Sequence, residues 1–370
     1  MRLRKVCRAG AKGAARRASG RRDQRRPSGL ERARHLPNVN FLKTEQGRIE
    51  GRVSAYIARR LVHAALVVLL VSILIFAVMR LLPGDPVLMF VTSGDMLAAS
   101  AEQIAKLRHD YGLDKPLPFQ YVDWITHVAQ GDLGRSILFH YSVTDEILRR
   151  LPISMSLGIT ALLVGLIIGP IIGAVSAVKR GTWLDTLLTV AATIGITAPS
   201  FWVAIILIYV FGLKLGLLPV YGYTSPLTDF GTSLQQSLLP VLVLSVFPVA
   251  AAARQTRSSV LEVLQLDYVR TARAKGLNEQ TTIFRHVLKN ALMPVATLQG
   301  EIFRNVIAGS VVVETVFVIP GMSRLLVDGM LSQDYAVVQG VIMVVAVAVV
   351  LGNLCVDLIY GWLDPRIQYT

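Results

Sequence analysis

Charged residues and cysteines are scarce in this sequence. Charged residues make up 17% of the 370 positions and hydrophobic residues 53%, a balance too apolar for the surface of an ordinary soluble protein. Cysteine occurs only as Cys7 and Cys355, which does not support a disulfide framework. The composition therefore favours a chain embedded in a lipid bilayer.

Several motifs of catalysis and metal binding are also absent. The sequence contains no G-x-x-x-x-G-K-[ST], the loop whose backbone amides cradle nucleotide phosphates. It contains no H-E-x-x-H helix and no nucleophile with a matching base, which argues against an intramembrane enzyme. His63 and His109 have no matching ligand cluster. We therefore expect a chain that is not an enzyme and that binds neither a metal nor a cofactor.

The net charge of +14 is concentrated at the N-terminus. Residues 1–52 hold 16 Lys+Arg and 4 Asp+Glu, so the rest of the chain is nearly neutral. Because no zinc-finger spacing or other nucleic-acid module accompanies these charges, we expect no nucleic-acid partner. The segment 1–52 has low complexity and almost no aromatic residues, which predicts a basic disordered leader; contact with anionic lipid is an alternative.

The boundary at residue 52 has a second interpretation. Purine-rich codons for Glu50 and Gly51 can act as a ribosome-binding site before a GTG start codon at Val53. Residues 1–52 are then a mis-assigned leader. The intact mass of the native protein distinguishes the two interpretations, because a mature chain that begins at Met1 contradicts the later start.

Long uncharged stretches predict membrane-spanning helices. Stretches of about 18 or more residues are enough to cross a hydrocarbon core of ~30 Å. We predict six spans, at about 61–82, 153–178, 185–211, 237–256, 291–313 and 335–361. Five prolines within or at the ends of these spans predict kinked or broken helices: Pro170, Pro199, Pro240, Pro248 and Pro294.

The distribution of basic residues predicts the orientation. Lys and Arg collect on the cytoplasmic side of membrane proteins, and here they precede the first span at Arg59 and Arg60 and enrich the loop 254–290. Both termini are then cytoplasmic. The predicted fold is an all-α polytopic membrane protein with a first transmembrane helix in 53–82, an extracytoplasmic helical segment in 83–152, and a five-helix core in 153–370 that contains a cytoplasmic loop at about 257–290.

The loop between the fourth and fifth spans reads as two short helices. Asp267 is predicted to cap the first helix, and Gly276 to end it at a positive φ. Asn278 is predicted to cap the second helix, whose apolar face comprises Ile283, Phe284, Val287 and Leu288. From these residues alone, a partner-binding loop and a solvated basic loop both remain open.

Ordered motifs extend over about 56–369. They include Leu82-Pro83-Gly84-Asp85-Pro86, Gly131-Asp132-Leu133-Gly134-Arg135-Ser136, Pro199-Ser200-Phe201-Trp202, Asn290-Ala291-Leu292-Met293-Pro294 and Asp364-Pro365-Arg366. These motifs resemble the dipeptide/oligopeptide/nickel branch of ABC importer permeases (binding-protein-dependent transport inner-membrane components). The resemblance implies a bacterial inner-membrane permease with six spans. It also implies a homologous second permease subunit, two cytoplasmic ATPases that bind ATP and Mg, and an extracytoplasmic solute-binding protein.

The resemblance also assigns a role to the cytoplasmic loop, which corresponds to the ATPase-coupling loop of ABC permeases. The implied coupling residues are Asp267, Tyr268, Arg270, Thr271, Ala272, Arg273, Ala274, Lys275 and Gly276. Arg270-Thr271-Ala272 stands where the general motif has an acidic residue followed by two alanines, so the contact made by that acid is missing here.

The fifth predicted span contains four polar residues, Gln299, Glu301, Arg304 and Asn305. Ionisable groups at membrane depth normally face a cavity or each other. One hypothesis is a polar lining of the solute pathway, suited to zwitterionic peptides. The other is a structural pair of Glu301 and Arg304, which are i,i+3 neighbours.

A different transporter class is the runner-up. A secondary transporter would couple solute to ions through intramembrane acids such as Glu301 and Asp357. It is favoured by inverted repeats, and we find no convincing repeat. The solute itself stays open among dipeptides, longer peptides, glutathione and nickel chelates.

Overall fold

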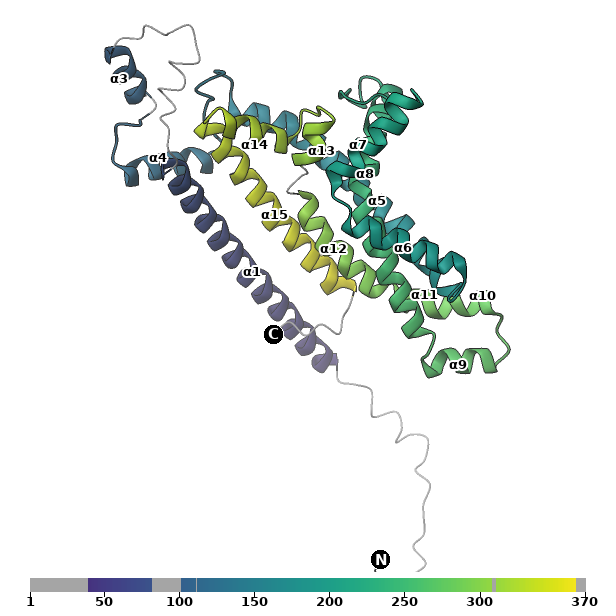
Figure 1. Cartoon of the computed structure of the whole chain (residues 1–370). Helices are drawn as coiled ribbons and strands as arrows, with labels where there is room; N and C mark the ends of the chain where they lie inside the picture. The colour runs from purple at the N-terminus through teal and green to yellow at the C-terminus, as the bar shows by residue number, and fades with distance from the viewer. Residues whose placement is uncertain (1–38, 82–100, 111, 308–310, 364–370) are drawn as a thin grey trace, which may run out of the picture. The chain divides into compact units, whose positions relative to one another are not determined.

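The computed structural model describes residues 39–81, 101–110, 112–307 and 311–363, and these are almost entirely helical (Figure 1). By contacts, the chain divides into two units, Met1–Tyr56 and Ile57–Thr370. All contacts discussed below lie within the second unit. Its described part contains helices and turns, with one isolated antiparallel bridge between Arg135 and Ser142.

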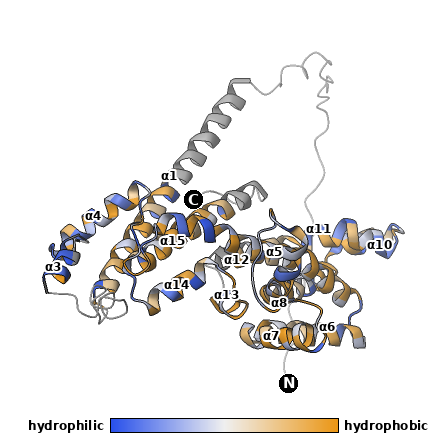
Figure 2. Cartoon of the chain, turned by 90° about the horizontal axis from the view of Figure 1, so that it is seen from above, coloured by the Kyte–Doolittle hydropathy of each residue, from blue (hydrophilic) through white to orange (hydrophobic). Residues whose placement is uncertain are grey.

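Four helices of the described residues are long and apolar enough to cross a membrane, and Figure 2 shows the hydrophobic colouring that dominates them. They are α1 (Val39–Leu81, apolar from Ala58), α5 (Val143–Val178), α8 (Phe230–Val263) and α15 (Tyr335–Leu363). A fifth span results if a bent pair counts as one, α6 (Trp183–Thr197) with α7 (Ser200–Leu207) and the π-helix η2 (Ile208–Lys214). Helix α1 begins at Val39, inside the stretch for which disorder is predicted; residues 1–38 lie outside the described part.

The expected fifth span differs from the prediction. Residues 293–307 form α12 (Met293–Ile307) and residues 311–316 form α13 (Val311–Val316), with 308–310 outside the described part. Neither helix passes as a span by length and composition. Helix α12 has 15 residues and α13 has 6, so each alone is too short to span the membrane. The described residues therefore hold four spans, or up to five, where the sequence predicts six.

Proline has different effects in the predicted spans. At Pro199 the chain bends by 111° between α6 and α7, because a residue before proline avoids the helical region and Ala198 accordingly has ψ 128°. Helices α5 and α8, in contrast, continue past Pro170, Pro240 and Pro248. A one-residue turn at Leu292 separates α11 (Leu288–Ala291) from α12 just before Pro294, so breaks accompany Pro199 and Pro294 but not the other three prolines.

Small residues bring α5 and α8 into close contact. Every fourth residue along one face of α5 is Gly or Ala, which lets two helix backbones approach closely: Ala161, Gly165, Gly169, Gly173 and Ala177. A Cβ at Gly169 would lie 2.5 Å from the Cβ of Ala252, and one at Gly173 would overlap the carbonyl oxygen of Ala253. The glycines are therefore required by the space that α8 occupies. We call these five residues the glycine stripe.

The segment before α5 packs on the ends of α1 and α15. It contains α3 (Ala101–Asp110) and α4 (Leu117–Ala129). Ile75 and Met79 of α1 meet Tyr335 and Val338 of α15 in a buried cluster, against which Trp124 of α4 packs. Helix α14 (Met322–Leu331) precedes α15. This arrangement joins the predicted extracytoplasmic segment to two spanning helices.

Candidate coupling site

Helix α8 leads through a three-residue turn into α9 (Asp267–Ala274), the first helix of the predicted coupling loop. The predicted stop is confirmed: Gly276 has φ 81°. Its backbone N–H donates to Arg273 O at 2.9 Å and that of Leu277 to Ala272 O at 3.4 Å. This pair of hydrogen bonds is the Schellman ending, in which glycine occupies the left-handed position.

The predicted start of α9 is wrong by one residue. Leu266, with φ −72° and ψ 147°, occupies the N-cap position and makes no side-chain cap. Asp267 is the first helical residue, and its exposed carboxylate lies 3.5 Å from Nη1 of Arg270. The residue with extended backbone before the helix is Leu266 and not Asp267. The carboxylate of Asp267 therefore interacts favourably with the helix dipole from within the first turn and does not cap a backbone N–H.

One face of α9 is buried against the ends of two spanning helices. Val269 and Ala272 are buried, whereas Arg270, Thr271, Arg273, Ala274 and Lys275 are exposed. Val269 belongs to a buried cluster with members from α5, α8 and the helices after α9: Ala177, Val260, Val263, Val269, Val287 and Ala291. We call it the valine cluster. It connects α9 directly to the last turns of α5 and α8.

The second helix of the loop consists of three pieces, α10 (Glu279–Thr281), the π-helix η3 (Thr282–Val287) and α11 (Leu288–Ala291). The predicted cap is confirmed, because Asn278 Oδ1 accepts from the backbone N–H of Thr281 at 2.7 Å. Ile283 and Val287 are buried as predicted, but Phe284 is 73% exposed. The α-helical period does not hold through η3, whose turns are wider, so the predicted apolar face is wrong at Phe284.

Side chains hold the two loop helices together. Asn290 Nδ2 donates to the hydroxyl of Tyr268 at 2.8 Å, and Arg273 Nη2 lies 3.8 Å from Glu279 Oε1. Because Val269 of α9 also packs in the same buried cluster as Ala291 of α11, the two helices form one unit. The exposed surface of this unit carries basic residues and Phe284.

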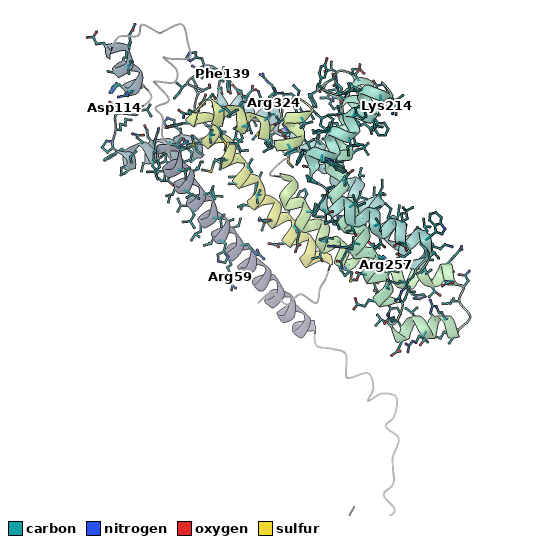
Figure 3. The ribbon with its side chains drawn as sticks, in the orientation of Figure 1. Arg59, Asp114, Phe139, Lys214, Arg257 and Arg324 are labelled. Atoms are coloured by element: carbon teal, nitrogen blue, oxygen red, sulfur yellow. The ribbon has the colours of Figure 1, made fainter. Side chains whose placement is uncertain are left out.

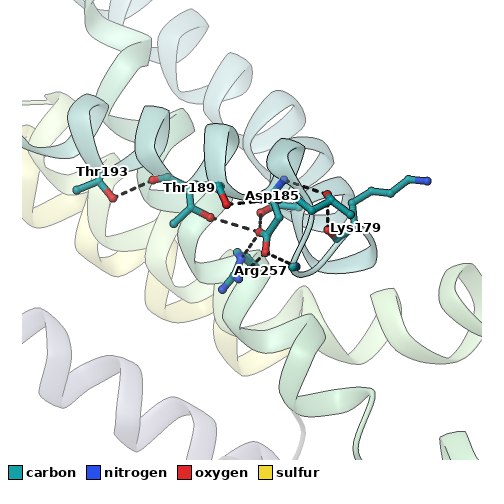
Figure 4. Close-up of polar contacts among 9 residues, drawn as sticks. Lys179, Asp185, Thr189, Thr193 and Arg257 are labelled. Atoms are coloured by element: carbon teal, nitrogen blue, oxygen red, sulfur yellow. Dashed lines mark hydrogen bonds and ion pairs between the residues drawn. The ribbon is translucent and has the colours of Figure 1, made fainter.

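A buried carboxylate joins three helices just before the loop (Figure 4). Arg257 of α8 donates to Asp185 of α6 through Nε at 2.8 Å and Nη2 at 2.9 Å. Ser176 of α5 donates to the same carboxylate at 2.6 Å, and the backbone N–H of Gly181 donates at 3.1 Å. Such a bidentate pair fixes both distance and orientation.

This ion pair has no local signature in the sequence. Figure 3 shows Arg257 in the part of α8 that leads to α9. The sequence shows an arginine directly after one predicted span and an aspartate at the start of another. The two residues are 72 positions apart. Nothing in the spacing selects Asp185 as the partner of Arg257.

The polar residues of α12 have different environments in the structure. Gln299 is 4% exposed and its Nε2 donates to Pro248 O of α8 at 3.2 Å, so it lies in a helix interface. Glu301 is exposed. Arg304 and Asn305 belong to α12, but their side chains lie outside the described residues. The pathway-lining hypothesis and the structural-pair hypothesis therefore both stay predictions for Glu301 and Arg304.

These features, several spanning helices with a packed helix pair at one end, define a class of membrane permease. Residues 153–369 match the family described as "Binding-protein-dependent transport system inner membrane component", and residues 53–158 match the corresponding N-terminal family. The chain belongs to this family, whose members are the membrane components of ABC importers. It is accordingly a multi-pass protein of the inner membrane, and not itself a catalytic subunit.

Curated relatives agree over most of the chain. A putative peptide transport system permease protein of Brucella abortus is 39% identical over 317 residues, covering 86% of this chain and all of the relative. A probable peptide ABC transporter permease protein of Sinorhizobium fredii has the same identity and coverage. The di/tripeptide transport system permease protein of Pseudomonas aeruginosa is 38% identical, covering 85% of this chain and 99% of its own.

Proposed function

We propose that this chain is one permease subunit of an ATP-driven importer for peptides or similarly sized solutes. The observation that carries the proposal is the similarity along almost the whole length of three peptide permeases from different bacteria. A homologous second permease subunit, two ATPases that bind ATP and Mg, and a solute-binding protein complete the transporter. Both termini and the α9–α11 unit face the cytoplasm, as the basic residues predict.

The α9–α11 unit is the ATPase contact in this proposal. Its exposed face offers Arg270, Arg273 and Lys275 together with the exposed ring of Phe284. Aromatic and arginine side chains are typical anchors of protein interfaces. Its buried face, through Val269, contacts the last turns of α5 and α8. A displacement of the unit by an ATPase is therefore delivered to both spanning helices.

Glu301 is the described residue that best fits a solute pathway. The buried residues of α12 follow one stripe, Val295, Gln299 and Ile302, and Thr297 and Glu301 are exposed on another face. Burial of an unpaired charge in lipid costs at least a few kcal/mol. An exposed carboxylate on a helix of a permease is therefore expected to face a polar cavity.

Reconstitution tests the overall proposal. The chain, co-expressed with the partner genes and purified as a complex in proteoliposomes, is expected to import a labelled dipeptide only with ATP and the solute-binding protein. Uptake that follows a proton or sodium gradient without ATP would support a secondary transporter instead. ATP-dependent uptake of a different solute class would support the assignment as an importer and contradict the assignment of peptides as its solute.

A double variant tests the pathway. Changing Glu301 and Arg304 to leucine is expected to leave the complex assembled while peptide uptake falls. Gln299→Leu is the matched comparison, because its side chain donates to Pro248 O inside the protein and should affect assembly more than solute selection. Wild-type uptake by the double variant would support the structural pair.

A further inference from the structure

A polar cavity lies where α1, α4 and α15 meet. It measures about 390 Å³ and is bordered by Arg80 of α1, Gln120 and Trp124 of α4, Arg135 of the following loop and Gln339 of α15. This cavity, the Arg80 pocket, is separate from the coupling site and from α12.

Four polar atoms of residues that line this cavity are buried without a hydrogen-bond partner. They are Arg80 Nε, Trp124 Nε1, Gln339 Nε2 and Gln120 Oε1. The side chains of Gln120 and Gln339 are more than nine-tenths buried. A buried polar group without a partner costs about 1–3 kcal/mol in proteins, so the three donors among them, Arg80 Nε, Trp124 Nε1 and Gln339 Nε2, indicate a ligand that accepts hydrogen bonds.

The chemistry of these atoms favours an anion. Arginine Nε and tryptophan Nε1 can only donate hydrogen bonds, so the ligand must accept. Arg80 and Arg135 add positive charge at the cavity, whereas the nearby Lys115 is already paired with Asp123 at 2.9 Å. The remaining lining carboxylate, Asp132, accepts from the backbone N–H of Gly134 at 2.9 Å. The cavity is thus rich in donors and cationic.

Aromatic rings hold the guanidinium of Arg80 in place. Its Cζ lies 5.3 Å from the centroid of the Phe76 ring and 5.1 Å from that of Tyr335, in cation–π geometry. Phe76 in turn stacks on Trp124 at 6.0 Å. The guanidinium of Arg80 is thus fixed between rings beside the cavity.

The position of the pocket favours a lipid headgroup. Arg80 is the penultimate residue of the apolar span Ala58–Leu81, at the depth where headgroups meet hydrocarbon. A second, almost wholly apolar cavity of about 440 Å³ runs between α1 and α15 and includes Ile125. Both cavities are therefore lined by α1, α4 and α15, with the apolar one nearer the middle of the two spanning helices.

We propose that the Arg80 pocket binds the phosphate group of an anionic phospholipid, with an acyl chain in the apolar cavity between α1 and α15. Arg80 Nε, Trp124 Nε1 and Gln339 Nε2 donate to the phosphate oxygens. A charge-assisted hydrogen bond contributes about tenfold or more in affinity, so the site should distinguish anionic from zwitterionic lipids.

The test is native mass spectrometry of the assembled transporter, released from nanodiscs that contain phosphatidylglycerol and phosphatidylcholine in equal amounts. We expect the complex to retain phosphatidylglycerol about tenfold over phosphatidylcholine. Arg80→Gln should bring this ratio close to one. Arg149→Gln is the matched control, because Arg149 is exposed, does not line the pocket and pairs with Glu146 at 3.5 Å.

A second variant keeps the test decisive if Arg80→Gln fails to assemble. Trp124→Phe removes the indole N–H but keeps a ring against Phe76, and it should also lower the ratio. The same measurement is repeated with inorganic phosphate added. Binding of free phosphate without a preference between the two lipids overturns the lipid assignment. Retention of neither ligand shows that water alone fills the pocket, and it overturns the proposal.

Discussion

Arg60 of α1 and Asp357 of α15 form an ion pair, with Nη1 of the arginine 2.8 Å from Oδ2 of the aspartate. Asp357 is one of the acids that a secondary transporter would use for ion coupling. In the structure it holds the first and last spanning helices together at the ends expected to face the cytoplasm. The contact supports a structural role for Asp357. In this respect Asp357 differs from Glu301, which is exposed.

We expect Asp357→Asn to retain ATP-dependent uptake and to lower stability slightly. The effect on the free energy of unfolding should be about 1 kcal/mol or less, because Arg60 is 45% exposed and solvent screens the pair. Thermal unfolding of the purified complex and uptake in proteoliposomes measure the two effects. Complete loss of uptake with normal stability would favour ion coupling through Asp357.

The pair of Asp185 and Arg257 should contribute more. Asp185→Asn removes the charge that both guanidinium donors meet, and we expect a loss of about 1–2 kcal/mol in unfolding free energy. The figure lies below that for a fully buried pair because the Arg257 side chain is 29% exposed.

A double-mutant cycle with Arg257→Gln checks this assignment. The combined variant should lose less stability than the two single variants together, because each alone leaves a charge without its partner. Arg180→Gln is the control, since Arg180 is an exposed residue of the same turn. Additive losses across the cycle would show that the two side chains do not stabilise each other.

Gly276→Val should uncouple ATP hydrolysis from import. A β-branched residue at φ 81° costs on the order of 1–2 kcal/mol, and the change displaces α10 and α11 relative to α9. We expect a folded, inserted permease that binds its ATPases weakly or hydrolyses ATP without uptake. ATPase association and uptake in proteoliposomes measure this.

Gly131 provides the matched control for that variant. It has φ 86°, and a Cβ on either glycine would meet nothing within 4 Å. Gly131→Val therefore imposes a similar backbone cost in the segment before α5, away from the coupling loop. If both variants impair coupling equally, or if Gly276→Val keeps full ATPase binding and uptake, α9 is not the coupling element.

Gly173→Ala is expected to disrupt the packing of α5 on α8. The added Cβ overlaps Ala253 O, and overpacking of this kind costs about 1–3 kcal/mol. Gly231→Ala in the first turn of α8 is the comparison, because its Cβ has an ordinary contact 3.5 Å from Asp229 Oδ1. It should be neutral or slightly stabilising. Equal unfolding temperatures for both variants would contradict the close contact.

Val318 is a site where stability can be gained. It has φ 54° at the end of α13, and Ile319 N–H donates to Glu314 O at 2.8 Å in a Schellman ending. Asparagine tolerates this backbone better than valine, so Val318→Asn should add about 1 kcal/mol to the unfolding free energy. Val311→Asn, a similarly exposed change within α13, should not. A lower unfolding temperature for Val318→Asn would contradict the strain.

Features set by near neighbours could be predicted from the sequence. The stop at Gly276 and the cap at Asn278 depend on residues within four positions, and the apolar runs of α1, α5, α8 and α15 are visible directly. The recurrence of a small residue at every fourth position of α5 is also visible in the sequence. Nothing in the sequence identifies α8 as the helix that these small residues contact.

Other features depend on long-range contacts or on irregular helix geometry. Phe284 was placed on the wrong face because η3 does not keep the α-helical period. Asp185 and Arg257 meet only when α6 packs on α8. The orphan atoms of the Arg80 pocket come from three helices, and Gln339 of α15 is more than 200 residues from the others, so no local pattern could assemble them.

The glycine stripe also affects how the transporter can move. Helices in backbone contact have no long side chains between them that can change rotamer and absorb a displacement. Sliding α5 against α8 would drive Gly169 or Gly173 into the larger neighbours of its partner. We therefore expect the two helices to move together as one rigid pair, with any rearrangement at their contacts with other helices.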